Sequence, residues 1–387
     1  METVRTPGVL SGAIQPYAWG SREVLPRIMG VPPTGEPQAE LWLGAHPRAP
    51  SILRRSGTNR PLNQVIADDP VGELGASAAQ SFGGELPFLL KILAVDKPLS
   101  LQTHPTRSQA QAGFDSEDEQ GIPLDAEHRS YRDRNHKPEM ICALEPFTAL
   151  CGLRPPESAA ALLDSLEVAA LDPAISFLQA GEIAPALRWL LERSPESGTE
   201  IAQQVAAACA EPGPFADERH WGVQIGEQHP GDIGVAIALI LNLVRLEPGQ
   251  ALFLGAGNLH VYLRGAVVEV MANSDNVLRG GLTVKNVDVP ALLDVVDCRP
   301  HEVLVQAPTR PCFTFEAPVP DFSLTRVELA GSQRFAPSGP EIVLCASGSL
   351  TVAGHEITGG GAVWVPAGAG ALEMAGNGLV FRAATGG

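Results

Sequence analysis

The sequence predicts a mainly β protein that carries an α-helical domain, and three observations indicate this fold class. The 40 glycines and 34 prolines among 387 residues require many turns, as a framework of short strands does. Short apolar runs bounded by Gly, Pro or Asn recur in residues 1–152 and again from residue 246 onward. Between these two regions, residues 153–245 place alanine and leucine at helical spacing. With 44% hydrophobic residues, the chain can form two or three domains.

The first β region contains strand-length runs at residues 39–44, 88–95 and 140–144, each rich in residue types that are usually buried. A short helix is expected at residues 62–67, where the sequence Asp-Asp-Pro ends it. The polar, acidic segment 107–135 predicts an irregular loop, and we consider it a candidate flap over a site.

The middle region predicts helices at residues 157–166, 183–192 and 200–210. The apolar run 235–244 is too short to span a bilayer, so we expect a buried helix there. Strands are predicted to resume at residues 251–254, 261–263 and 266–270, and then at 341–346, 349–352, 362–365 and 379–382.

Strands at this spacing, separated by Gly-rich turns, favour double-sheet jelly rolls. We therefore expect a catalytic jelly roll formed by residues 1–152 and 246–300, a helical domain at residues 153–245, and a second jelly roll at residues 301–387. Of the nine histidines, only His355 lies among the strands predicted from residue 341 onward, so this second β region has few residues that could bind a metal.

Charge and cysteine usage limit the classes of partner. Acidic residues outnumber basic residues by 44 to 27, and the resulting charge of −17 repels a nucleic-acid backbone. The six cysteines form no CxxC pair, which argues against disulfides and for a reducing compartment. The N-terminus shows no signal-peptide pattern. We expect a cytoplasmic monomer that contacts neither nucleic acid nor a membrane.

Lysine is unusually rare, because only four of the 27 cationic residues are lysines. A lysine retained in an arginine-rich chain offers a compact point charge or an amine that can lose a proton. Random placement remains an alternative for any one of them. The four are Lys91 and Lys97 before the Gln102-Thr-His104 triplet, Lys137 two residues before Glu139, and Lys285 after Arg279.

Four separated residues have the chemistry of a divalent-metal site. Gln102 and His104 are two apart, so both side chains lie on one face of a strand. Glu139 begins a second predicted strand and His260 a third. An amide, a carboxylate and two imidazoles leave a bound ion with net positive charge, and the imidazoles favour zinc over magnesium. Each residue taken alone is equally compatible with a structural role, such as Glu139 in a buried ion pair.

Five further residues supply acid–base groups and a fixed cation for this site. We consider Lys137 and Asp275 the leading groups for proton transfer, closely followed by Glu269, with His136 as a further candidate. The permanently charged Arg279 suits an oxyanion or a phosphate. Structural roles remain an alternative, because Asp275 lies in the turn-forming sequence Ser274-Asp-Asn276 and His136 begins the strand lead-in His136-Lys-Pro138, which the proline shapes.

The motifs in the chain resemble those of type I phosphomannose isomerases, and the resemblance extends over most of the length. The matching segments are Tyr17-Ala-Trp19-Gly20, Ala39-Glu-Leu-Trp42-Leu-Gly-Ala-His46-Pro, Lys97-Pro-Leu-Ser100-Leu-Gln102-Thr-His104-Pro, Asn135-His-Lys137-Pro-Glu139, Pro230-Gly-Asp-Ile-Gly234, His260-Val-Tyr262-Leu and Ser274-Asp-Asn276-Val-Leu-Arg279-Gly-Gly-Leu-Thr283-Val-Lys285.

This resemblance implies cupin-type jelly rolls and one zinc ion per chain, held by Gln102, His104, Glu139 and His260. It implies an enzyme that interconverts mannose 6-phosphate and fructose 6-phosphate through an enediol. The implied proton-transfer and substrate groups are Lys137, Tyr262, Glu269, Asp275 and Arg279, and we expect Trp19, Ser100, Lys97 and Lys285 to line the substrate cleft.

The sequence departs from the family pattern at three places, and none of them removes a predicted ligand. Thr106 replaces a frequent acidic residue, Asn258 and Leu259 replace a Glu-Pro pair, and Val284 replaces a proline. Two other functions remain open: a metal-dependent cupin enzyme acting on another sugar, and a sugar-phosphate-binding protein without catalytic activity.

Overall fold

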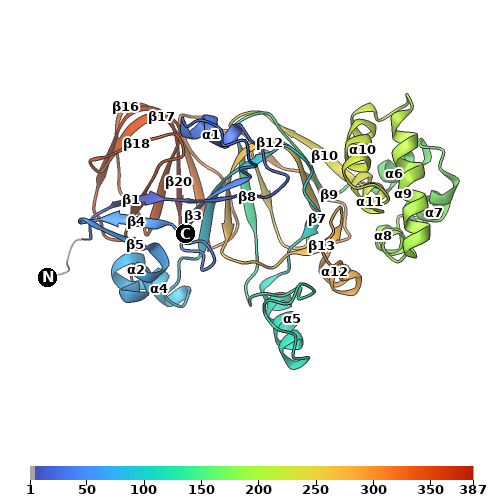
Figure 1. The fold of residues 1–387 in the computed structure, drawn as a ribbon, viewed down its shortest axis with the longest axis horizontal. Coiled ribbons are helices and arrows are strands. Elements are labelled where there is room, and N and C mark those ends of the chain that lie inside the picture. Colours follow the sequence, from blue (N-terminus) through green and yellow to red (C-terminus); the bar gives the residue numbers. More distant parts are fainter. Residues whose placement is uncertain (1–4, 387) are drawn as a thin grey trace.

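The computed structural model describes residues 5–386 and consists of two β assemblies side by side with a helical lobe at one end (Figure 1). Nearly all pairing between strands is antiparallel, and the helical lobe is formed by residues 156–239. The predicted fold class, mainly β with a helical domain, is therefore confirmed.

The central assembly contains the strands that carry most of the predicted site. These strands are β2 (Ala13–Gln15), β3 (Glu40–Gly44), β6 (Phe88–Val95), β7 (Leu101–Thr103), β8 (Glu139–Ala143), β9 (Phe147–Leu153), β10 (Leu241–Leu246), β11 (Ala251–Leu254), β12 (His260–Ala272), β13 (Leu278–Gly281) and β14 (Val305–Gln306). The long strand β12 pairs with β7 and β9 through its first half and with β6 and β8 through its second half. It therefore belongs to both walls of the barrel-like assembly.

Gly265 allows β12 to pass from one wall to the other. Its φ of +117° lies in a region that favours glycine, and a Cβ here would stand 2.4 Å from the carbonyl oxygen of Pro146. The two strands predicted at residues 261–263 and 266–270 are thus halves of one bent strand.

The second assembly is formed mainly by C-terminal strands. Its strands are β1 (Gly8–Ser11), β4 (Ile52–Arg55), β5 (Thr58–Pro61), β15 (Cys312–Thr314), β16 (Ser323–Phe335), β17 (Glu341–Val352), β18 (His355–Thr358), β19 (Ala362–Val365) and β20 (Leu372–Ala384). Because β1 pairs with both β19 and β4, a piece of the N-terminal region completes this sheet. The pairing of β1 with β19 joins strands that the expected domain bounds assign to different jelly rolls. The bounds themselves stay a prediction.

A shared apolar core joins the two β assemblies. Leu41 and Phe88 of the central strands belong to one buried cluster with Phe322, Trp364 and Phe381 of the C-terminal strands. Because this cluster draws residues from both sets of strands, the two assemblies share one hydrophobic core.

The helices form the lobe and several short caps on the sheets. They are α1 (Val24–Met29), α2 (Leu62–Asp68), α3 (Pro70–Leu74), α4 (Ala76–Ser81), α5 (Arg107–Glu119), α6 (Pro156–Asp164), the 3₁₀ turn η1 (Ala169–Leu171), α7 (Asp172–Gln179), α8 (Ile183–Leu191), α9 (Pro195–Ala210), α10 (Ala216–Gln228), α11 (Gly234–Leu239) and α12 (Val289–Val295). The sequence did not indicate α7 or α10. Helix α10 contains Gly222, which disfavours a helix but lets α10 approach Cys209 of α9, where a Cβ would meet Sγ at 2.5 Å.

Two local predictions were wrong. Residues 107–119 form helix α5 rather than a loop, because Thr106 and Gln109 make a capping box: Thr106 Oγ1 accepts from the Gln109 N–H, and Gln109 Oε1 accepts from the Thr106 N–H. The apolar run 235–244 is not one helix, since α11 ends at Leu239 and β10 begins at Leu241. Across residues 5–386, no helix is long and apolar enough to cross a membrane.

Candidate active site

Three predicted metal ligands converge at one end of the central assembly. His104 follows β7, Glu139 begins β8 and His260 begins β12, and all three side chains are buried. One ligand atom from each lies within 4.8 Å of the others. Nε2 of His104 is 3.3 Å from Oε1 of Glu139, and Nε2 of His260 is 3.7 Å from Oε2.

The two imidazoles are oriented as metal ligands are. Nδ1 of His104 lies 2.8 Å from the carbonyl oxygen of Asn276, and Nδ1 of His260 lies 3.0 Å from that of Asn258. Each Nδ1 must donate to its carbonyl, so each Nε2 carries a lone pair. Both Nε2 atoms are buried, and neither has a hydrogen-bond partner among residues 5–386. Burial and the nearby Lys137 lower the pKa of His104 to about 4, and burial lowers the pKa of His260. Neutral imidazoles and one carboxylate fit a divalent zinc ion.

Gln102 lies on the same face of the sheet as His260. The two residues are direct partners in the β12–β7 pair, and Gln102 is also the partner of Arg279 in the β13–β7 pair. Directly opposed residues of antiparallel strands place their side chains on one face. The amide of Gln102 therefore stands between an imidazole and a guanidinium, and its role as a ligand stays a prediction.

The carboxylate of Glu139 has two further partners. Lys137 Nζ is 2.9 Å from Oε1, and the Tyr262 hydroxyl donates to Oε2 at 3.1 Å. Burial raises the pKa of Glu139, but Lys137 and His104 lower it more strongly, so the carboxylate is ionised. Tyr262 is only 2% exposed and packs edge-on against Phe147, so its hydroxyl supports Glu139 directly.

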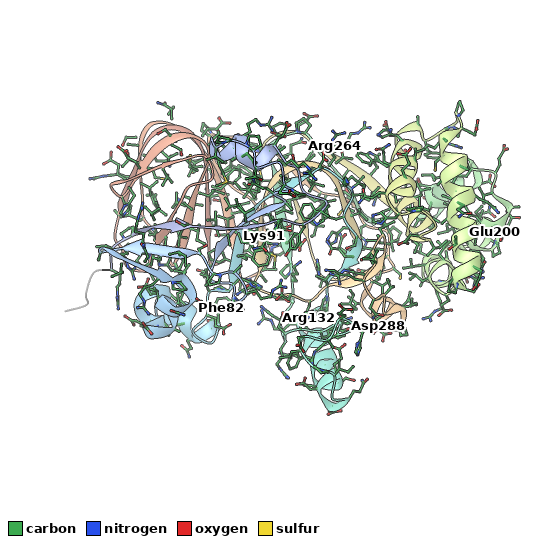
Figure 2. The ribbon with its side chains drawn as sticks, viewed as in Figure 1. Phe82, Lys91, Arg132, Glu200, Arg264 and Asp288 are labelled. Atoms are coloured by element: carbon green, nitrogen blue, oxygen red, sulfur yellow. The ribbon has the colours of Figure 1, made fainter. Side chains whose placement is uncertain are left out.

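A buried lysine behind the metal ligands was not among the site residues predicted from sequence. Lys91 Nζ lies 2.8 Å from Oε2 of Glu269, which was predicted, and 3.6 Å from Oε2 of Glu40. Burial lowers the pKa of Lys91, but Glu269 and Glu40 raise it more, so the ammonium stays charged. Figure 2 shows Lys91 within the β body. A signal existed, since Lys91 is the only charged residue in the otherwise apolar segment Phe88–Val95.

Asp275 is held at the edge of the site by two neighbours, His46 and Arg48, that were not among the site residues predicted from the sequence. Arg48 Nη2 donates to Oδ1 at 2.7 Å, and His46 Nε2 lies 3.4 Å from Oδ2. Burial raises the pKa of Asp275, but the hydrogen bond from His46 and the charge of Arg48 have the larger effect, so the pKa lies below its ordinary value. Asp133 fixes the same turn, because it accepts from the Asp275 N–H at 2.7 Å and from Ser274 Oγ at 2.9 Å.

Three cations, Arg132, Arg279 and Lys285, lie close enough to affect one another, and among residues 5–386 they have no carboxylate partner. Burial and the charges of Arg279 and Arg132 lower the pKa of Lys285, and burial and Arg132 lower that of Arg279. Within residues 5–386 none of the three forms a salt bridge, and the guanidinium of Arg132 donates to two backbone carbonyls. Figure 2 places Arg132 beside α5. Unpaired clustered cations are suited to an anionic ligand.

The other predicted residues lie around this centre. Trp19 stacks on Tyr17 with ring centroids 5.9 Å apart, and its carbonyl accepts from the N–H of Lys97. Lys97 is exposed and Ser100 is half-buried. The ring of His136 contacts Asp321 rather than the metal ligands. The contacts of these residues with substrate stay predictions.

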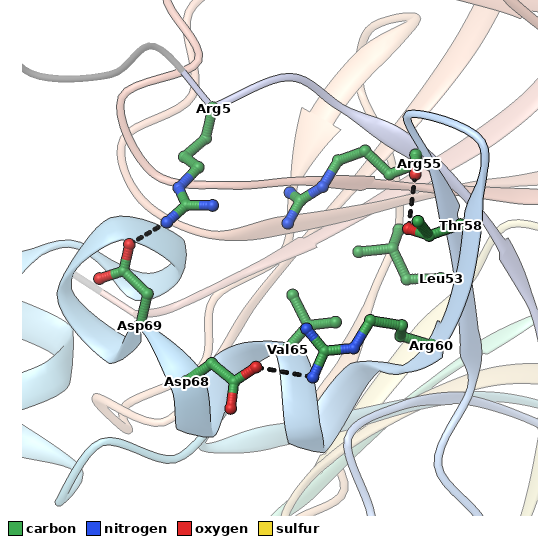
Figure 3. Close-up of a pocket in the computed structure, with 8 residues that line it drawn as sticks. All are labelled: Arg5, Leu53, Arg55, Thr58, Arg60, Val65, Asp68 and Asp69. Carbon is green, nitrogen blue, oxygen red and sulfur yellow. Dashed lines mark hydrogen bonds and ion pairs between the residues drawn. The ribbon is translucent and has the colours of Figure 1, made fainter.

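A second concave feature lies away from these residues (Figure 3). This cavity of about 250 Å³ between β4, β5 and α2 contains Arg5, Arg55 and Arg60. Each of these arginines is paired with an acid, namely Asp69, Glu73 and Asp68 respectively. The cavity thus lacks the free cations that distinguish the site around Arg279.

Comparisons with known proteins agree with this geometry. The family profile "Phosphomannose isomerase type I, catalytic domain" matches residues 9–156. The mannose-6-phosphate isomerase of Escherichia coli K12 is 38% identical over 356 residues, which cover 89% of each chain. The chain belongs to the type I phosphomannose isomerase family.

The likeness extends to a distant organism and to a solved structure. The human mannose-6-phosphate isomerase is 35% identical over 367 residues, which cover 84% of this chain and 82% of the human one. A structure of the Salmonella typhimurium mannose 6-phosphate isomerase, bound to its substrate fructose 6-phosphate and to zinc, superposes with a TM-score of 0.90 and 34% identity. The superposition covers 99% of this chain and 100% of that one.

The three departures from the phosphomannose isomerase pattern leave the site intact. Thr106 caps helix α5, Asn258 accepts the Nδ1–H of His260, and Val284 is fully exposed beside Lys285. Thr106 therefore stabilises the segment that follows His104, and Asn258 orients the ring of His260.

Proposed function

We propose that this protein is a zinc-dependent aldose–ketose isomerase that interconverts mannose 6-phosphate and fructose 6-phosphate. The observation that carries this proposal is the buried cluster of His104, Glu139 and His260, in which the two histidine Nε2 atoms have no hydrogen-bond partner. Lys137 contacts Glu139, and Arg279, one of three clustered cations, is the strand partner of Gln102. The family relationship points to the same reaction.

Four residues would hold the zinc ion: Gln102, His104, Glu139 and His260. When bound there, zinc supplies a Lewis acid that polarises the oxygens of the sugar. Tyr262 and Lys137 keep Glu139 ionised and correctly oriented, and the carbonyls of Asn258 and Asn276 fix the two imidazoles.

We assign the sugar phosphate to Arg279 and Lys285, with Arg132 as a third cation. These residues have no internal carboxylate partner, so a phosphate would relieve their mutual repulsion. Because Arg279 neighbours Gln102 across the β13–β7 pair, the same guanidinium can also offset charge on the enediolate.

Proton transfer requires a base that removes the C2 proton from the open-chain aldose. The C2–H electron pair then forms the C1–C2 double bond while the C1 oxygen receives a proton, which gives the enediol. The C2 hydroxyl then loses its proton to form the C2 carbonyl while C1 is protonated, and the product is the ketose. Lys137 and Asp275 are our leading groups for these transfers, followed by Glu269, with His136 as a further candidate. Trp19 and the stacked Tyr17 would form the wall beside Lys97 and Ser100.

The decisive experiment compares chelated protein with zinc-restored protein. Mannose 6-phosphate is supplied to each, and fructose 6-phosphate is followed by a coupled assay. We expect product only after zinc is restored. A protein that binds mannose 6-phosphate but incorporates no solvent deuterium at C1 or C2 would be a sugar-phosphate-binding protein instead.

We also propose that the protein is a cytoplasmic monomer. All six cysteines are free, as expected in a reducing compartment. Light scattering after size-exclusion chromatography would test the monomer, and a dimer mass would contradict it.

A further inference from the structure

One buried carboxylate of the C-terminal jelly roll, that of Asp321, contacts two residues that lie near metal ligands in the sequence. Asp321 lies just before β16 and is 0% exposed. Its Oδ1 accepts from Arg107 Nη2 at 3.0 Å, and its Oδ2 lies 2.8 Å from His136 Nε2. Both partners belong to the central assembly, so the contact crosses between the two β assemblies.

The two partners of Asp321 flank two of the metal ligands. Arg107 lies three residues after His104, and His136 lies three residues before Glu139. These ligands come from different strands, β7 and β8, which are not paired with each other. The carboxylate of Asp321 therefore links the segment that follows His104 to the segment that precedes Glu139.

The contact also fixes the position of the His136 ring. Nε2 of His136 lies 2.8 Å from Oδ2 of Asp321 and 2.9 Å from Nη2 of Arg107, and Arg107 Nη2 also donates to Oδ1 of Asp321. The three side chains therefore form one closed cluster, and a change at Asp321 acts on both His136 and Arg107.

The segment around His136 is fixed from a second side. The carbonyl of Asn135 accepts from Asn276 Nδ2 at 2.8 Å, and the backbone of Asn276 in turn accepts the Nδ1–H of His104. A shift of His136 would therefore displace both the segment that carries Glu139 and the segment that orients His104.

We infer that Asp321 is a positioning residue for the active site, supplied by the C-terminal jelly roll. It fixes the position of the His136 ring and sets the spacing between the segments that carry His104 and Glu139. This inference rests on the proposed isomerase activity, and it gives the C-terminal jelly roll a part in that activity.

The test compares Asp321→Asn with a matched control, Glu341→Gln. Glu341 is a buried acid of the same jelly roll, and Arg382 holds both of its oxygens at 2.8 and 2.9 Å. We expect Asp321→Asn to lower kcat roughly tenfold or more with KM within about threefold, as for residues that orient a catalytic group. Glu341→Gln is expected to lower the melting temperature comparably while kcat stays within about twofold.

A double mutant separates positioning from simple stabilisation. If Asp321 acts through His136, adding Asp321→Asn to a His136→Gln variant lowers kcat by less than about twofold more. Equal losses of kcat in Asp321→Asn and Glu341→Gln, or fully additive losses in the double mutant, would overturn the inference.

Turnover of mannose 6-phosphate by the wild-type protein is the reference for these comparisons. Because wild-type turnover is measured first, its absence would count against the proposed function. Normal wild-type turnover with an unaffected Asp321→Asn variant would count against Asp321 alone.

Discussion

Lys91 and Glu269 face each other across strands β6 and β12, and their charged atoms lie 2.8 Å apart in a part of the site closed to solvent. Trp42, the partner of Lys91 on the other side, places its ring 5.4 Å from Nζ and donates to Glu40. The ammonium therefore holds two buried carboxylates in the wall of the site, which explains why a lysine interrupts an apolar strand.

Replacing Lys91 by methionine should destabilise the protein strongly. The change leaves Glu269 and Glu40 buried without their cation, and breaking a buried ion pair on one side costs about 3–5 kcal/mol. Urea denaturation would measure this loss. The double variant Lys91→Met with Glu269→Gln should recover part of it, because the buried charge is removed as well. Equal stability of the single and double variants would show that Glu269 is not the group left uncompensated.

Removing a metal ligand should abolish zinc retention and activity together. We expect His260→Ala and Gln102→Ala to lose bound zinc in metal analysis and to lose turnover of mannose 6-phosphate, because each takes one donor from a site of four. Phe253→Leu, a change on the neighbouring strand β11, serves as a control that should retain metal. Full activity of a metal-free His260→Ala protein would refute the assigned ligands.

Lys137→Arg tests whether an amine must exchange a proton. Arginine keeps the positive charge near Glu139 but does not give up its proton in proteins. We expect kcat to fall by roughly 10²–10⁴, the usual contribution of an acid–base group, with zinc content unchanged. Near-normal kcat would remove Lys137 from proton transfer and leave Asp275 and Glu269 as the remaining candidates.

Predictions from the sequence were most accurate where the local pattern was compatible with only one kind of structure. The strand at residues 88–95 is buried throughout, and His104, Glu139 and His260 lie close together, whereas the role of Gln102 stays a prediction. The run 235–244 was different, because a continuous apolar stretch fits a buried helix or a buried strand equally well, and the chain uses both.

Contacts between distant segments could not be predicted in this way. Asp321 has no local motif, and its importance arises only when the C-terminal jelly roll packs against residues 107 and 136. His46 and Arg48 stood in or beside a quoted motif, yet only the fold brings them to Asp275. The capping box of α5, in contrast, was readable from Thr106 and Gln109 and was missed.

Arg279→Gln should weaken substrate binding and slightly stabilise the substrate-free protein. The guanidinium stands among like charges without an acidic partner, so its removal relieves repulsion and should raise the melting temperature. If Arg279 binds the phosphate, KM for mannose 6-phosphate should rise roughly tenfold or more, and inorganic phosphate should inhibit less. A fall in kcat at constant KM would assign Arg279 to the enediolate instead.

Asp133→Ala should disturb catalysis through the turn that carries Asp275. The carboxylate accepts the N–H of Asp275 and the side chain of Ser274, and the next residue, Asn276, supplies the carbonyl that orients His104. Leaving these donors unsatisfied should cost about 1–3 kcal/mol in urea denaturation.

The control for this change is Asp288→Ala, which removes a carboxylate that caps helix α12 through the N–H of Ala291. Loss of that cap costs about 1 kcal/mol without touching the turn. Because Asp133 connects to both Asp275 and His104, Asp133→Ala should lower kcat and also speed zinc loss to a chelator, while Asp288→Ala should change neither. Zinc release at the wild-type rate in Asp133→Ala would show that the His104 ring keeps its orientation without this turn.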